Sequence, residues 1–369
     1  MTSTIDPVTF SPVDPKGGKG ITVHTPSLRI ERVRVRELLS FAAEAAAGQS
    51  FAEVAPLTGL RAASMARNPC ASPEDVALLV ALQGGRCVGY QGLLPGRLLS
   101  AAGASPVHWL ITLFVAPECR GRGVARRLIQ EALGLGLDLA AVGPARAADA
   151  AYRSAGFATL GELRLRRFSI EHLPRAVHGL ALSVLCAGRP ATGFRPVPRI
   201  PAGAERRPAD LPRFLRDAQV VDWMLAHPWV VSRAEAPALA RPYHFSHARD
   251  RFRLEAWETA GGGLPGAVVL SAGQNKGAGR VKLLDLFLPA ADAAAACAVA
   301  LRRARALRAA RIDFPAEVDP ALAASRLLRR FTRWKSRTTV YHPGAPDSAL
   351  AHAAGAIHLD PCDGDAAFT

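Results

Sequence analysis

The stretch from Trp109 to Leu128, WLITLFVAPECRGRGVARRL, constrains the fold most strongly. Residues 109–115 are apolar and rich in β-branched and aromatic types, and they are too few for a buried helix. We therefore expect a buried strand that ends before Pro117. From Val124 onwards the apolar residues recur with helical spacing. A glycine-containing turn that opens a helix presents unpaired N–H groups and the positive end of the helix dipole, so we predict an anion site suited to phosphate.

The turn between this strand and this helix carries a specific pattern. The residues Arg120-x-x-Gly123-x-Ala125 resemble the [QR]xxGx[GA] acyl-CoA loop of the GNAT N-acetyltransferase superfamily, whereas the GxGxxG and GxxxxGK[ST] patterns do not fit here. The resemblance implies that main-chain N–H groups of the turn bind the pyrophosphate of acetyl-CoA or another acyl-CoA. The predicted cofactor-binding residues are Leu113, Phe114, Val115, Arg120, Gly121, Arg122, Gly123, Val124, Ala125 and Arg126.

A second match lies in the segment from Tyr152 to Phe157, YRSAGF, which resembles the (F/Y)-Y-x-x-x-G-F segment of the same superfamily. The resemblance implies that Tyr152 protonates the thiolate of CoA as it leaves. An Asn that often precedes this Tyr by seven residues is replaced by Ala145. The strand 109–115 contains no acidic residue, so His108 is the nearest candidate for the general base.

The order of the expected elements extends the resemblance to residues 28–170. It reads β, α, α, β, β, β, loop, α, β, α, β, which is the order of the GNAT fold. The expected strands are 28–35, 76–82, 87–94, 107–115, 137–142 and 157–170, and the expected helices are 36–47, 60–67, 124–133 and 145–155.

A similar order returns in the second half, but without the loop. Here a helix is expected over 213–227, and strands over 251–258, 267–272, 281–288, 311–314 and 332–341. Helices over 290–310 and 320–331 complete this half. The chain enters the longer helix through Ala290-Ala291-Asp292 instead of an RxxGx[GA] turn. We therefore predict an α/β (α+β) protein with two GNAT-like domains, each a mixed, mostly antiparallel twisted sheet flanked by helices, of which the second is degenerate.

The domain prediction has five parts. A flexible N-terminal arm is expected over 1–26 and a GNAT domain with the acyl-CoA loop over 27–187. A linker rich in Pro and Arg over 188–212, a degenerate GNAT-like domain over 213–343 and a C-terminal tail over 344–369 follow.

Composition limits the partners and the compartment. The 369 residues carry a net charge of +15, mostly from dispersed arginines without interleaved aromatic residues, which favours acidic small molecules over nucleic acid. The six cysteines lack CxxC or CxxH spacing, so no metal site is predicted. The N-terminus has no signal-peptide pattern and no apolar run reaches about 18 residues. We therefore expect a cytoplasmic protein without a membrane span.

These patterns predict an acyl-CoA-dependent, most simply acetyl-CoA-dependent, N-acyltransferase. The expected acceptor is a small-molecule amine, for example a phosphorylated one, an amino sugar or a nucleotide-linked amino sugar. Tyr243, His244 and His247 are candidates for lining an acceptor site between the domains. Two alternatives stay open at this point: a protein or peptide N-acetyltransferase, and a CoA-binding sensor or scaffold without turnover.

Overall fold

The computed structural model describes residues 27–186, 193–204, 211–259, 266–275, 277–288 and 292–365. The predicted arm, residues 1–26, lies outside these residues, as do parts of the predicted linker. The first half contains the strands β1 (Leu28–Arg34), β2 (Val76–Gln83), β3 (Arg86–Ser100), β4 (Gly103–Val115), β5 (Leu139–Val142) and β6 (Ala158–Ser169). Its helices are α1 (Leu38–Ala47), α2 (Gly59–Met65), α3 (Val124–Leu133), α4 (Arg146–Ser154) and α5 (Arg175–Cys186).

The second half also consists of strands and helices. Its strands are β7 (Phe194–Val197), β8 (Arg213–Phe214), β9 (Val231–Ser232), β10 (Ala248–Arg249), β11 (Arg251–Thr259), β12 (Ala267–Asn275), β13 (Ala278–Phe287), β14 (Ala309–Pro315) and β15 (Thr332–His342). Its helices are α6 (Ala218–Ala226), α7 (Ala293–Leu307), α8 (Asp319–Ala323), α9 (Arg326–Phe331) and α10 (Ala349–Ala353).

Most predicted elements are present with the expected type and order. The helix expected over 320–331 is instead divided into α8 and α9, because the Ser325 side chain caps α9 by accepting from the Leu328 N–H group. The helix expected from Arg213 begins at Ala218, where Asp217 supplies the cap. The β3–β4 hairpin is longer than predicted, because pairing continues from Pro95 to the turn at residues 100–103.

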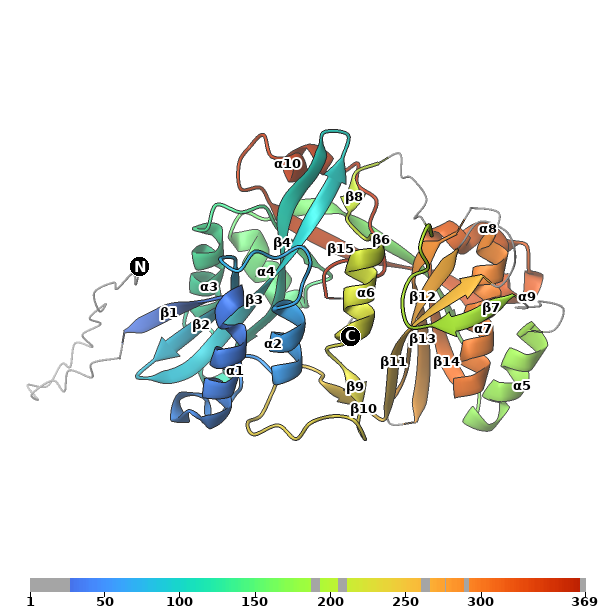
Figure 1. Cartoon of the computed structure of the whole chain (residues 1–369), viewed down its shortest axis with the longest axis horizontal. Helices are drawn as coiled ribbons and strands as arrows, with labels where there is room; N and C mark the ends of the chain where they lie inside the picture. Colours follow the sequence, from blue (N-terminus) through green and yellow to red (C-terminus); the bar gives the residue numbers. More distant parts are fainter. Residues whose placement is uncertain are drawn as a thin grey trace, which may run out of the picture.

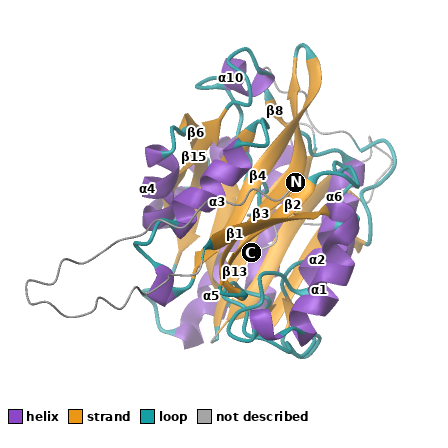
Figure 2. Cartoon of the chain, turned by 90° about the vertical axis from the view of Figure 1, so that its left-hand side faces the viewer, coloured by secondary structure: helices purple, strands orange, loops and turns teal. Residues whose placement is uncertain are grey.

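One 13-stranded sheet runs through both halves of the chain, in the order β1-β2-β3-β4-β5-β15-β6-β14-β13-β12-β11-β7 with β8 paired to β3. The β4–β5 and β13–β14 pairs are parallel and the other described neighbours in this sheet are antiparallel. The prediction of a mixed, mostly antiparallel sheet flanked by helices is confirmed. Figure 2 shows α3 and α4 on one side of this sheet and α1, α2 and α6 on the other.

The two halves exchange a strand at the centre of the sheet. Strand β15 lies between β5 and β6, although it belongs to the second half of the sequence, and β6 lies between β15 and β14 (Figure 1). Helix α5 then packs against α7. The sheet is continuous across the predicted boundary between the domains 27–187 and 213–343. The division into these two domains therefore stays a prediction.

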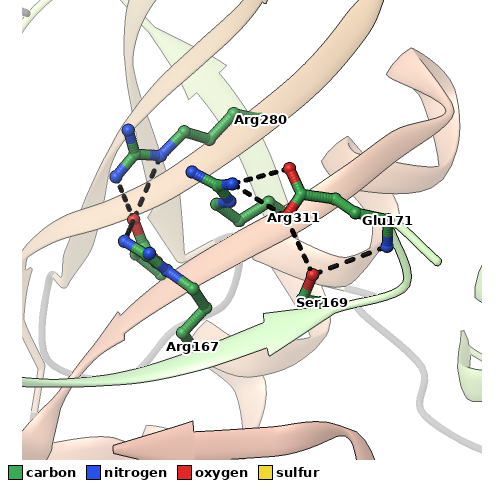
Figure 3. A network of polar contacts seen from close by, with 6 residues as sticks. Arg167, Ser169, Glu171, Arg280 and Arg311 are labelled. Carbon is green, nitrogen blue, oxygen red and sulfur yellow. Dashed lines mark hydrogen bonds and ion pairs between the residues drawn. The ribbon is translucent and has the colours of Figure 1, made fainter. Parts of the chain in front are cut away.

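Ion pairs join the exchanged strands (Figure 3). Arg167 on β6 donates from Nε to Oδ1 of Asp313 on β14 at 2.6 Å, and Arg280 on β13 contacts the other carboxylate oxygen. Asp313 is only 1% exposed. Burial acts to raise the pKa of Asp313, but the bonds from both arginines more than offset it and the pKa lies below its usual range. The carboxylate is therefore charged and joins three strands from the two halves.

The segment expected as a C-terminal tail is folded into the molecule. After α10, Cys362 is buried and its thiol donates to Oδ2 of Asp285 on β13 at 3.4 Å. Asp363 is buried and pairs with Arg216 at 3.1 Å. Gly364 lies against the ring of Trp109 on β4. This segment, residues 358–365, therefore contacts both halves.

Candidate functional site

A wedge between β4 and β5 forms the first part of the site. The two strands pair at His108 and Trp109, and the described residues contain no further pair between them. Strand β4 then forms a bulge at Thr112 and Leu113, opposite Gln91 of β3, with Thr112 at a φ of 52°. A bulge redirects a strand and ends its pairing. The last residues of β4 consequently present an edge whose backbone groups can bind a ligand.

The glycine turn lies at the open end of this wedge. Gly121 and Gly123 have φ values of 76° and 81°, which explains the glycines, because other residues rarely adopt this conformation. Gly123 starts α3 without a side-chain cap, and its carbonyl accepts from the Arg127 N–H group. The N–H groups of the first turn before Arg127 have no partner within the helix. Arg120 fixes the turn to β4 by donating to the Val115 carbonyl at 3.2 Å.

The predicted cofactor residues occupy these two places. Leu113 and Val115 are half-buried on the unpaired end of β4, whereas Phe114 is buried. Arg122 and Arg126 are exposed on the turn and on the outer side of α3. The remaining positions, Arg120, Gly121, Gly123, Val124 and Ala125, succeed each other along the turn and the helix start. The turn and the helix start therefore have the geometry that suits an anionic ligand.

Tyr152 reaches the bulge from α4. Its hydroxyl donates to Oε1 of Gln91 at 3.0 Å, and Gln91 in turn donates from Nε2 to the Ile111 carbonyl at 2.6 Å. Tyr152 is 2% exposed. Burial raises the pKa of Tyr152 well above its usual range, and the hydrogen bond with Gln91 only partly offsets this. The phenol is thus neutral and keeps its proton, and the hydrogen bond to Gln91 fixes its orientation.

Gln91 was not predicted from the sequence. It is a polar residue within the apolar strand 87–94, fully buried, and its amide is used on both sides. Such an isolated polar residue in a buried strand is the signal that could have identified it, because buried amides require partners.

His108, the predicted base, lies before the bulge, where β4 and β5 still pair. It is 4% exposed, and neither ring nitrogen has a hydrogen-bond partner among the described residues. Burial lowers the pKa of His108 and the charge of Asp75 partly offsets this, so the imidazole is neutral. His108 precedes Ile111 by three residues, about 10 Å along a strand. The structure therefore does not bring His108 and Tyr152 together, and the base role stays a prediction.

An aromatic cluster covers the sheet near the bulge. Tyr90 stacks on Phe114 with ring centroids 5.2 Å apart, and His244 lies 4.8 Å from Phe114. Tyr243 contacts Phe245, which also contacts Tyr90. Two of the predicted acceptor residues, Tyr243 and His244, are thus brought to β3 and β4.

The third predicted acceptor residue, His247, contributes a backbone contact. Its carbonyl accepts from the Val231 N–H group at 3.2 Å.

A further group of polar residues has the composition of a metal site. Glu317, His358 and Asp360 offer ligand atoms within 4.8 Å of one another. Nε2 of His358 lies 2.7 Å from Glu317 and 3.3 Å from Asp360, and hydrogen bonds with both carboxylates raise the pKa of His358 to about 10. A protonated imidazole cannot ligate a metal. The arrangement is therefore explained as an ion pair. None of the helices among the described residues has the length and hydropathy to span a membrane.

Comparison with known proteins gives a consistent picture. Residues 37–157 match the model of the acetyltransferase (GNAT) family. No curated protein matches the sequence significantly. A GCN5-related N-acetyltransferase from Anabaena variabilis is 12% identical, with a TM-score of 0.50 over 86% of this chain and 73% of that chain. One from Kribbella flavida is 15% identical, with a TM-score of 0.47 over 86% and 71%. The first likeness supports the fold alone.

Proposed function

We propose that the protein transfers the acyl group of acetyl-CoA, or of another acyl-CoA, to an amine of a small molecule, since residues 37–157 match the model of the acetyltransferase (GNAT) family. The wedge of β4 and β5 with its glycine turn carries this proposal. The turn offers main-chain N–H groups and a helix N-terminus to the pyrophosphate, and the exposed arginines around it add positive charge. The unpaired end of β4 is available for the rest of the cofactor.

The roles proposed for side chains rest on their environment. Tyr152 holds a proton at the bulge and would deliver it to the thiolate that leaves, since a neutral buried phenol can act as a general acid. Gln91, on β3, accepts the hydrogen bond from the Tyr152 hydroxyl and is itself held by the Ile111 carbonyl. It is therefore proposed as a positioning residue for Tyr152. His108 is retained as the proposed base with a neutral ring nitrogen.

The acceptor is proposed to be a small molecule. The aromatic cluster near the bulge is built from both halves, with Phe245 in contact with both Tyr243 and Tyr90. This covering favours a compact acceptor over a protein segment, which needs an open groove. An amino sugar, free or nucleotide-linked, remains one proposed acceptor.

Thiol release from acetyl-CoA tests the proposal. Wild-type protein is assayed with amino sugars, polyamines, amino acids and a lysine-containing peptide. We expect release with at least one small amine. Release with the peptide alone would favour the protein-modifying alternative, and acetyl-CoA binding without release would favour a sensor.

Two glycine variants form a matched pair for the same assay. Gly123→Glu places a carboxylate in the proposed pyrophosphate site, whereas Gly136→Glu introduces the same charge after α3. Gly136 has a φ of 67° and open space around it, so both variants carry comparable backbone strain. We expect Gly123→Glu to abolish turnover and Gly136→Glu to retain it. Equal activities would show that the turn does not bind the cofactor.

A further inference from the structure

Two buried side chains and one half-buried side chain near the bulge carry buried hydrogen-bond donors without a partner among the described residues. The donors are Nε and Nη1 of Arg61 and the hydroxyls of Tyr90 and Tyr243. Arg61 is 2% exposed and Tyr90 fully buried. A buried polar group without a partner is costly, because it has lost its bonds to water and gained none in return. Three such side chains in one place are therefore a feature that a ligand would explain.

The guanidinium of Arg61 is held in a fixed plane. It lies 4.5 Å from the ring centroid of Trp229 and 5.2 Å from that of Tyr243. Its Nη2 is directed to the Ser246 carbonyl at 3.5 Å. The helix that carries Arg61 is itself anchored, because Trp229 donates from Nε1 to the Ser64 hydroxyl at 2.9 Å. Nε and Nη1 thus remain as fixed, charged donors. Their N–H bonds point in different directions, so each can give one charge-assisted hydrogen bond to an anion.

The two tyrosines belong to the same electrostatic environment. Burial raises the pKa of Tyr90, and the Arg61 charge lowers it in part. Burial likewise raises the pKa of Tyr243 to about 12, again partly offset by Arg61. Both phenols are therefore protonated donors beside a cation. One cation with two neutral donors matches a singly charged carboxylate.

The cluster adjoins the reacting end of the proposed site. Tyr90 precedes Gln91, the partner of Tyr152, and neighbouring residues of a strand point to opposite faces. Tyr90 also pairs with Phe114, directly after the bulge. The Tyr90 hydroxyl and Tyr152 consequently lie on opposite faces of the sheet, both next to the bulge of β4.

The surrounding charge also favours an anion. Asp365 is the described acid that interacts with Arg61, and burial raises its pKa although Arg61, Lys282 and Arg337 lower it. Burial lowers the pKa of Lys282 well below its usual range, so this lysine does not count as a cation here. Arg61 and Arg337 both interact with Asp365, so two cations face this acid and a further negative charge is favourable.

We propose that Arg61, with the hydroxyls of Tyr90 and Tyr243, binds the carboxylate of the acceptor, so that the substrate is an amino-carboxylic acid. This inference rests on the proposed function and narrows its acceptor. The amine of such a substrate would be directed to the wedge, while its carboxylate accepts hydrogen bonds from the guanidinium of Arg61 and from the two tyrosine hydroxyls.

Thiol release from acetyl-CoA with matched pairs tests this inference. The probes are the twenty amino acids, β-alanine and 4-aminobutyrate, each beside its own carboxamide, which has the same shape without the charge. We expect at least one acid to exceed its amide in kcat/KM by about 10- to 100-fold, the range for hydrogen bonds to a charged group. In Arg61→Met this ratio should fall towards one, with KM for acetyl-CoA unchanged.

Two other variants keep the test independent of folding. Tyr90→Phe with Tyr243→Phe removes only the unpartnered hydroxyls and leaves both rings in place, and we expect KM for the preferred acid to rise. Arg67→Met is the control, since Arg67 is a cation just after the same helix, and its side chain bonds to the Ala63 carbonyl at the surface. It should retain the preference for the acid.

The outcomes separate the two levels of the proposal. Equal use of acids and amides, or an unchanged ratio in Arg61→Met, would overturn the carboxylate site while the transferase function stands. The same holds if amino sugars or polyamines react and no panel acid does. If no amine of any class releases thiol, the proposed function itself fails.

Discussion

Strands β4 and β13 occupy corresponding places in the two halves and share their geometry up to one point. Each pairs in parallel with the next strand of its own half over a few residues, and each then contains a bulge, at Thr112 in β4 and at Leu284 in β13. Both strands end shortly before a proline, Pro117 or Pro289. The wedge is thus a property of the repeated fold and does not by itself create a cofactor site.

The halves differ in the segment that leads from the strand into the helix. The first half enters α3 through Gly123 without a side-chain cap, whereas the second half begins α7 after Asp292, whose carboxylate would repel an anion at a helix start. Residues 289–291 lie outside the described part of the chain. In the second half Asp285, at the bulge, accepts a hydrogen bond from Cys362. This bulge therefore anchors the C-terminal segment 358–365 of the chain.

The largest effect on kcat is expected at Tyr152, the proposed general acid, which has no tyrosine counterpart in the second half. The position of Tyr152, six residues before its strand β6, corresponds to Arg326 before β15. Tyr152→Phe should lower kcat by about 10²- to 10⁴-fold, the usual contribution of a general acid. Steady-state thiol release measures this. Tyr341→Phe serves as the control, because Tyr341 is a half-buried tyrosine on β15. An equal loss of kcat in both variants would contradict the role of Tyr152 as general acid.

The strand exchange predicts that the halves unfold together. Asp313→Ala leaves the partly buried Arg167 and Arg280 without their carboxylate, so the free energy of unfolding should fall by about 3–5 kcal/mol. Urea denaturation followed by tryptophan fluorescence and by circular dichroism should give one common transition in the wild type. Two separate transitions would show that the halves are independent despite the shared sheet.

A smaller effect is expected where the C-terminal segment meets the second half. The pKa of His358 is raised from 6.5 to about 10 by Asp360 and Glu317, so its stabilisation is fully present below pH 6.5 and is lost as the pH rises through 10. The wild type should exceed His358→Gln by about 1 kcal/mol at pH 6, because the pair is partly exposed. This difference, measured by thermal denaturation, should vanish near pH 10. A difference that grows with pH would contradict the ion pair.

The local features of the first half were predictable from the sequence. The strand, the turn and α3 can be read from periodicity and from glycines at Gly121 and Gly123, all encoded within about 20 residues. Tyr152 was predicted because its segment has a pattern of its own. In each case neighbouring residues alone determine the structure.

Non-local arrangements could not be predicted in this way. The sequence predicts both β6 and β15. It does not predict which strands are their neighbours in the sheet, because the two halves resemble each other and each strand could pair within its own half. The segment 358–365 is short and polar, which is typical of a tail, although Cys362 and Asp363 are buried. Arg61 lies in a predicted helix, and only its aromatic partners, Trp229 and Tyr243, distant in sequence, reveal its role.

Calorimetric titration with acetyl-CoA tests the comparison of the two halves most directly. The account predicts one equivalent bound per chain in the wild type and in Asp292→Ala, and none in Gly123→Glu. Two equivalents per chain, or undiminished binding by Gly123→Glu, would contradict the assignment of the cofactor to the first half.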